Sequence, residues 1–385
     1  MRIAIEKFNG EQLQQALDAR KWSVGMLAEM SDISESMLYY LINNEKKPSH
    51  ETLVKISSTL KLPETFFCKK QEVEFTHSFF RSLKRSAKTS RISVDVKIKW
   101  VSNIRNFLSN YVEFPKLNLP DLDDFKDRDP HSLTLNEIED LAQKVREFWD
   151  LHNSVIQNTT LLFENNGLFV TKFTIGSEDV DALSKVDITN NNPYILLSSD
   201  KNSRSRTKFD NAHELGHYLL HSALDTKLFD VGKKDNHDLL EEQANRFAGA
   251  FLLPEVSFSR DFAYPTLEHY KVLKSKWKVS IALLVYRSHQ LELINDRTYK
   301  NLQINISKRG WRKNEPLEDL IELETPSLAQ RAFDLIFKEK LISVQEMEDK
   351  IGLFSAEIEK ICGLEKGFFD KYKLEQQRPV LRLVK

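Results

Sequence analysis

Cysteine is nearly absent from this chain, and its scarcity argues against two kinds of stabilised fold. Cys68 and Cys362 are the only cysteines among 385 residues, and neither belongs to a CxxC pair. Neither a disulfide framework nor a thiolate zinc site is therefore indicated. A reducing cytosol is the compartment that we expect.

Long apolar runs and a targeting segment are also missing. No run approaches the roughly 18 apolar residues that a membrane-spanning helix requires. The first residues, MRIAIEKFNG, lack the basic start, apolar stretch and small-residue cleavage site of a signal peptide. We therefore expect a cytoplasmic protein that has no membrane partner.

The chain as a whole has almost no net charge, but one of its segments is strongly basic. The formal net charge is -1, whereas residues 66–100 contain nine Lys or Arg against three Asp or Glu. The centre of this strip, RSLKRSAKTSR, includes Lys84 and Arg85, which we expect to follow the phosphate backbone of DNA. A solvated linker is the alternative.

The first 67 residues have the apolar spacing of five short helices. Between Glu11 and Phe67, apolar residues recur every three or four positions in short blocks. Ser23 and Ser34 are suitable N-caps for the central pair, and Asp32 and Ile33 fill a tight turn between the two helices. If the second helix enters a major groove, base edges would be met by residues at its start and on its outer face, namely Ser34, Glu35, Ser36, Tyr39 and Asn43.

These features carry a resemblance that covers the whole segment. From GEQLQQALDARKW through SDISESMLYYLINN to LVKISSTLKLPETFF, the chain resembles the Xre, or Cro/CI-type, helix-turn-helix domain. The resemblance implies a double-stranded DNA operator, and two half-sites favour a homodimer. One departure is that residues 10–65 contain six basic and eight acidic residues, so the usual positive face is missing. A helix-turn-helix that contacts proteins instead remains open.

The rest of the chain divides into three further parts. The run YVEFPKLNLPDLDDFKDRDP reads as an extended linker, so that we predict domains at 1–68, 69–129, 130–263 and 264–385. In the third of these, GLFVTKF, DALSKVD and PYILLSS predict a small antiparallel sheet. We expect residues 193–198 to lie at a sheet edge, where they would pair with a substrate backbone. The predicted fold class is α+β, with a helical C-terminal region.

The motif HELGH is the strongest chemical signal. His213 and His217 lie one helical turn apart, about 6 Å along the axis, so both imidazoles can meet one ion. Glu214 follows the first histidine and can act as general base toward a water at that ion.

A catalytic zinc site needs a third protein ligand, and the helix predicted for LLEEQANRFAGAFLLP offers one. Glu241 and Asn245 share one face, so Glu241 can ligate the ion while Asn245 accepts the spare N–H of a ligating histidine. Glu242 is the competitor, and His237, in a predicted DNHD loop, is a weaker candidate. His221 is too far along its helix to be a ligand, about 12 Å from the first histidine. It either supports a ligand, lies on the substrate side or faces solvent.

This pair of motifs also carries a resemblance. RTKFDNAHELGHYLLH followed by EEQANRFAGAFLLP is similar to the ImmA/IrrE metallopeptidase family, whose zincin-like site has the form HExxH…ExxA(D/N). The resemblance implies that His213, His217 and Glu241 hold Zn²⁺, or another divalent metal such as Mn²⁺, and that Glu214 is the general base. The sequence does not indicate which residue would stabilise the oxyanion.

The resemblance further implies a regulator that hydrolyses a regulatory protein, either an Xre-type repressor or itself. The alternative is a DNA-binding regulator or antitoxin whose metal domain senses a signal or binds a partner with little proteolysis. Only the first reading needs Glu214.

Overall fold

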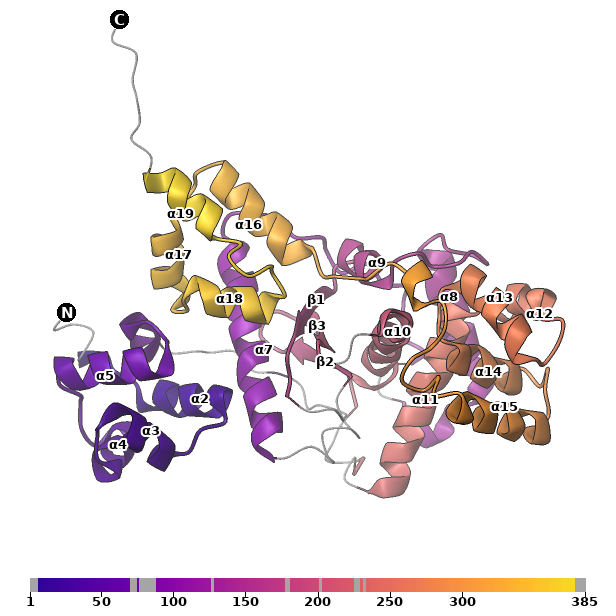
Figure 1. The fold of residues 1–385 in the computed structure, drawn as a ribbon, viewed down its shortest axis with the longest axis horizontal. Helices are drawn as coiled ribbons and strands as arrows, with labels where there is room; N and C mark the ends of the chain where they lie inside the picture. The colour runs from indigo at the N-terminus through magenta and orange to yellow at the C-terminus, as the bar shows by residue number, and fades with distance from the viewer. Residues whose placement is uncertain are drawn as a thin grey trace, which may run out of the picture.

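The computed structural model describes residues 6–69, 75, 88–125, 128–176, 181–200, 203–224, 229–230 and 233–377. Helices and one small sheet make up these segments, so the predicted α+β class is confirmed. Figure 1 shows the long helix α7 (Lys88–Leu108) crossing the molecule. The helix-turn-helix domain lies on one side of it and the sheet on the other, and the last helices lie across one end of α7, with α18 in contact with both α7 and β1.

From Gly10 to Cys68, the N-terminal domain contains four α-helices and a short 3₁₀ helix where five helices were predicted. They are α2 (Gly10–Arg20), α3 (Val24–Ser31), α4 (Glu35–Ile42), α5 (His50–Leu60) and η1 (Glu64–Cys68). The Ser23 and Ser34 side chains cap α3 and α4 by accepting from the amides of Met26 and Met37. Asp32 turns the chain between these helices with a φ of 54°. The predicted caps and turn are confirmed.

The sheet is mixed, which corrects the expectation of an antiparallel one. Its strands are β1 (Phe169–Phe173), β2 (Ala182–Asp187) and β3 (Asn192–Ser198), in the order β1-β3-β2. β3 pairs parallel with β1 and antiparallel with β2. The expectation that residues 193–198 form an edge is therefore wrong, because β3 is the central strand and β2 is the edge strand that contacts the HELGH helix.

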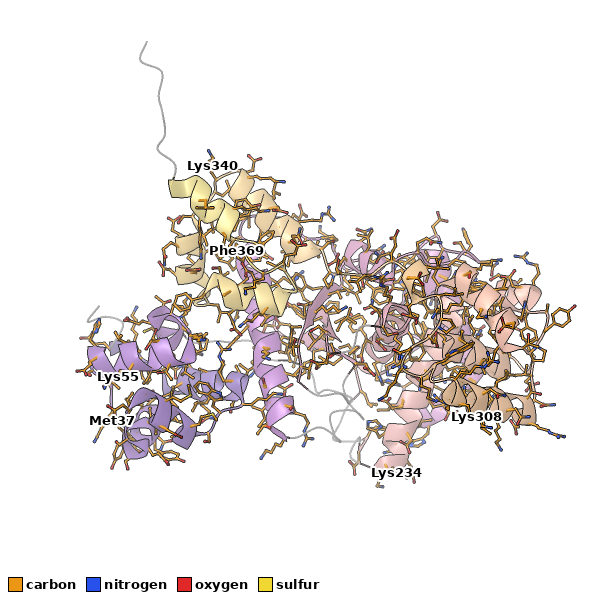
Figure 2. The ribbon with its side chains drawn as sticks, viewed as in Figure 1. Met37, Lys55, Lys234, Lys308, Lys340 and Phe369 are labelled. Carbon is orange, nitrogen blue, oxygen red and sulfur yellow. The ribbon has the colours of Figure 1, made fainter. Side chains whose placement is uncertain are left out.

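Alternation along the strands divides the apolar residues between two cores. In β3, Tyr194 and Leu196 face one core, while Ile195 and Leu197 face the other. The first core joins the sheet to the helix-turn-helix domain, α7 and four C-terminal helices, α16 (Leu328–Lys338), α17 (Val344–Ile351), α18 (Ser355–Cys362) and α19 (Asp370–Gln377). In Figure 2, Met37 and Lys55 mark the helix-turn-helix domain, and Phe369 lies among the C-terminal helices.

The second core lies on the other face of the sheet and surrounds the HELGH helix. It is built on α8 (Leu135–Phe148), α9 (Thr159–Asn165), α10 (Arg204–His221), α11 (Lys234–Leu252), α12 (Glu255–Asp261), α13 (Leu267–Trp277), α14 (Ile281–Gln290) and α15 (Asp296–Lys308). This core continues past residue 264, where the sequence predicts a boundary, because Leu267, Trp277 and Ile306 belong to it. Two 3₁₀ helices, η2 (Pro130–Ser132) and η3 (Glu318–Leu320), flank it. In the described segments, no helix has both the length and the apolar character needed to cross a membrane.

Candidate metal centre

The helices α10 and α11 pack closely, and a glycine permits their approach. A Cβ atom added to Gly216 would lie 3.1 Å from Phe247 Cδ1 and 3.2 Å from Ala244 Cα. The glycine of HELGH thus sets how near the first helix comes to the second. That separation decides whether side chains of the two helices can share one ion.

Three candidate ligands meet between these helices. The Nε2 atoms of His213 and His217 are 3.0 Å apart. Glu241 Oε2 lies 3.8 Å from His213 Nε2, and Glu241 Oε1 lies 3.5 Å from His217 Nε2. One donor atom from each of the three residues falls within 4.8 Å of the other two. The structure therefore brings together the set that the sequence predicts as metal ligands.

A hydrogen bond from α11 sets the tautomer of the first histidine. His213 Nδ1 lies 3.0 Å from Asn245 Oδ1. Because an amide oxygen only accepts, the proton of this imidazole is on Nδ1 and its Nε2 carries a lone pair. Asn245 occupies the position that the sequence assigned to it.

A longer relay sets the tautomer of the second histidine. The Gln243 amide nitrogen donates to the Pro130 carbonyl at 2.7 Å, so its Oε1 faces His221 Nε2 at 3.0 Å. The proton of His221 is therefore on Nε2, and its Nδ1 accepts from His217 Nδ1 at 3.0 Å. The Nε2 of His217 is left unprotonated as well. Of the three possibilities considered for His221, the structure shows a buried residue, 0% exposed, that contacts His217.

The two facing Nε2 atoms fit a divalent cation. In these tautomers neither Nε2 carries a proton, so their 3.0 Å separation brings two lone pairs together rather than a donor and an acceptor. Burial, followed by the charges of neighbouring groups, lowers the pKa of His213 to about 4 and that of His217 to about 3, so both rings stay neutral at pH 7. Two neutral imidazoles and a carboxylate form a donor set that suits zinc.

The general-base candidate lies on the sheet side of α10. Glu214 is 4% exposed, and its Oε2 accepts from the Ser184 hydroxyl of β2 at 2.7 Å. Burial raises the pKa of this carboxyl to about 8, although the hydrogen bond from Ser184 opposes the rise. The carboxylate is thus oriented by the edge strand and held away from bulk water.

The two competing ligand candidates differ in position. Glu242 is exposed and lies beside Arg246 and Tyr286, in a separate surface hollow. His237 is not in a loop, as the sequence suggested, but in the first turns of α11, where it is buried. Asp235 in the first turn favours helix formation here, since its charge complements the helix dipole.

The predicted DNA contacts fall into two groups. Ser34, Glu35, Ser36, Tyr39 and Asn43 are all exposed, and Tyr39 is 51% exposed. The hydroxyl of Ser34 is engaged as the cap of α4, so it is less free to read a base. Lys84 and Arg85 lie outside the described residues.

Sequence reasoning missed Ser184, Gln243 and the carbonyl of Pro130. Each belongs to a segment separated in sequence from HELGH, and no spacing pattern in the sequence predicts that this segment approaches α10. A buried glutamine two residues after a candidate ligand was the only local signal.

Family comparisons agree with this geometry. Residues 13–67 match a helix-turn-helix family model, and residues 163–289 match the IrrE N-terminal-like domain of peptidase family M78. No curated protein matches the chain. The chain is therefore a fusion of an Xre-type helix-turn-helix domain with a domain of the ImmA/IrrE peptidase family.

Proposed function

We propose that the protein is a DNA-binding regulator whose metal-dependent peptidase domain hydrolyses a regulatory protein. The observation that carries the proposal is the meeting of His213, His217 and Glu241 beside the buried carboxyl of Glu214. Zinc is the ion that we propose, with manganese as the alternative.

The residues of the site divide the work. His213, His217 and Glu241 would hold the ion, while Asn245 and His221 would keep the two imidazoles in the tautomers that ligation needs. A divalent ion held there would polarise a peptide carbonyl and lower the pKa of a water molecule. Glu214 would take the proton of that water and deliver it to the leaving amine.

Two features prepare Glu214 for this role. Burial raises the pKa of this carboxyl in the metal-free protein, and the positive charge of a bound ion would favour the carboxylate form that accepts a proton. The Ser184 hydroxyl orients it and comes from the edge strand β2, so a substrate backbone bound along β2 would lie beside the base.

The substrate that we propose is a regulatory protein, either an Xre-type repressor or this chain itself. The helix-turn-helix domain would bind a double-stranded DNA operator through the exposed face of α4, as a homodimer on two half-sites. A protein that works on an operator acts where the DNA is, which is the basis for proposing a cytoplasmic location.

Cleavage is tested by comparing new protein N-termini in cells that express the intact chain with those in cells that express Glu214→Gln, under several stresses. We expect termini that appear only with the intact chain, since glutamine keeps the acceptor for Ser184 but cannot take a proton. If metal stays bound and no terminus depends on Glu214 under any stress, peptidase activity is refuted. The alternative, a DNA-binding regulator or antitoxin whose metal domain senses a signal, then takes its place.

DNA binding is tested separately with Tyr39→Ala and a panel of operator sequences. Because Tyr39 is exposed on the outer face of α4, the substitution should change sequence preference rather than weaken binding to all sequences alike. Unchanged preference would remove α4 as the recognition helix.

A further inference from the structure

His237 is a buried imidazole whose polar atoms have no partner. Its side chain is in the first turns of α11, and the residue is 4% exposed. Neither ring nitrogen has a hydrogen-bond partner among the described residues. Leaving a buried polar group unpaired is unfavourable, so such a group in a native fold calls for a ligand or another explanation.

The ring lies beside the metal centre. His237 Nε2 is 4.0 Å from Glu241 Oε1, which is too far for a hydrogen bond and near enough for both atoms to approach one ion. Among the described residues, the three donors that fall within 4.8 Å of one another are those of His213, His217 and Glu241. The unpaired imidazole thus lies at the margin of this group, on the side of Glu241.

The spacing of His237 on its helix repeats that of the HELGH histidines. His237 and Glu241 are four residues apart on α11, as His213 and His217 are on α10. Two facing helices therefore each present a pair of donors one turn apart. Metal sites in the cores of helix bundles are built from such inward-facing donors on neighbouring helices.

We propose that His237 is a fourth, displaceable protein donor to the metal centre, which closes the resting site. The inference rests on the proposed binding of metal by His213, His217 and Glu241. A tetrahedral zinc site with four protein donors has no open position, whereas a catalytic site keeps one. The resting peptidase is therefore latent, and substrate must displace His237 before cleavage begins.

The displacement of a donor on the first turns of a helix needs only a local change. Figure 2 labels Lys234, the first residue of α11, at the outer end of that helix. His237 lies one turn further in, while Glu241 and Asn245 lie deeper along the same helix. Fraying of the first turn would withdraw His237 and leave Glu241 in place.

The test uses the full chain loaded with Co²⁺, whose visible absorption reports the number and type of donors, and with Zn²⁺ in competition with a chelating dye. We expect His237→Phe to change the cobalt spectrum and to raise the zinc dissociation constant at least tenfold. His289→Phe is the matched control, because His289 lies on α14 and its imidazole bonds to Asp296 at 2.7 Å. It should leave both readings unchanged.

Three results separate the possibilities. An unchanged cobalt spectrum with weaker zinc binding means that His237 only supports Glu241, and it overturns the inference. If His237→Phe changes neither the cobalt spectrum nor the zinc affinity, the inference is also overturned. If the wild-type chain binds neither metal, the proposed function itself is refuted. Unfolding of the metal-free variants in urea guards against misfolding, since phenylalanine replaces an unpaired polar ring and should not lower metal-free stability.

Discussion

The relay from Pro130 to His217 makes a quantitative prediction for Gln243→Met. In the wild-type chain, the amide orientation fixes the proton of His221 on Nε2, and the proton of His217 on Nδ1. Methionine removes the Gln243 acceptor, so the forward arrangement then loses the hydrogen bond that the buried His221 Nε2–H donates to it. The reversed arrangement avoids that cost and places a proton on His217 Nε2, 3.0 Å from His213 Nε2, where it can donate.

The size of the effect follows from that difference. An unpaired buried donor costs about 1–3 kcal/mol, so the metal-free variant is held in the reversed arrangement by about this amount. Metal binding must reverse both imidazoles, and the dissociation constant therefore rises by about 5- to 150-fold, since each 1.4 kcal/mol is a factor of ten. Substitutions in the outer shell of known metal sites cost about 10- to 100-fold, which is the same range.

The assay is zinc affinity, measured by competition with a chelating dye and accompanied by urea unfolding of the metal-free protein. Gln345→Met is the matched control, because Gln345 is exposed and bonds only to Asp349 four residues on. His221→Phe should weaken binding by the same route, so the double variant with Gln243→Met should be no weaker than the worse single variant. Multiplying losses, or an unchanged dissociation constant in Gln243→Met, would refute the relay.

Three further predictions concern the centre and its helices. Glu241→Ala should lower bound metal while Glu242→Ala should not, as metal analysis of the purified proteins would show; normal metal content in Glu241→Ala removes the third ligand. Gly216→Val should force α10 and α11 apart, lower the free energy of unfolding by about 1–3 kcal/mol and weaken zinc binding. Unchanged values would contradict this reading of the helix contact. The last prediction concerns metal-free protein between about pH 5 and 6. His213, His217 and His221 have lowered pKa values in the folded state, so the unfolded chain binds up to three more protons on them than the folded chain does. Glu214 has a folded pKa of about 8, so the unfolded chain binds one proton fewer there. Stability therefore falls on acidification, by up to about 2–3 kcal/mol per pH unit from these groups, and urea unfolding that showed the opposite sign would contradict the assignment.

The features that the sequence predicted well are those set by local spacing. The caps Ser23 and Ser34 and the turn at Asp32 depend on neighbours within three or four residues, and the structure has them as predicted. His213 and His217 likewise lie on one face of one helix because of their spacing alone. Each of these features depends only on residues that are close in the sequence.

The sequence-based predictions were wrong where contacts between distant residues determine the structure. Residues 182–198 form the expected antiparallel pair, but β1 pairs with the far side of β3 in parallel, which no alternation of apolar residues specifies. The sequence around His237, DNHD, has the composition of a loop, yet it lies in the first turns of α11, which begins at Lys234 and packs on α10. Burial of His237 follows from that packing.

The site also shows why ligand spacing does not by itself define a metal centre. HELGH and Glu241 supply donors, but the protons that leave both Nε2 atoms free are placed by Asn245 and, through Gln243, by a backbone carbonyl. That carbonyl belongs to Pro130, at the start of η2 and at the predicted boundary between linker and peptidase domain. A shift of the linker relative to α11 would break its bond to Gln243 and release the tautomer of His217. The segment that joins the helix-turn-helix and peptidase parts is thus hydrogen-bonded, through Gln243 and His221, to a candidate metal ligand.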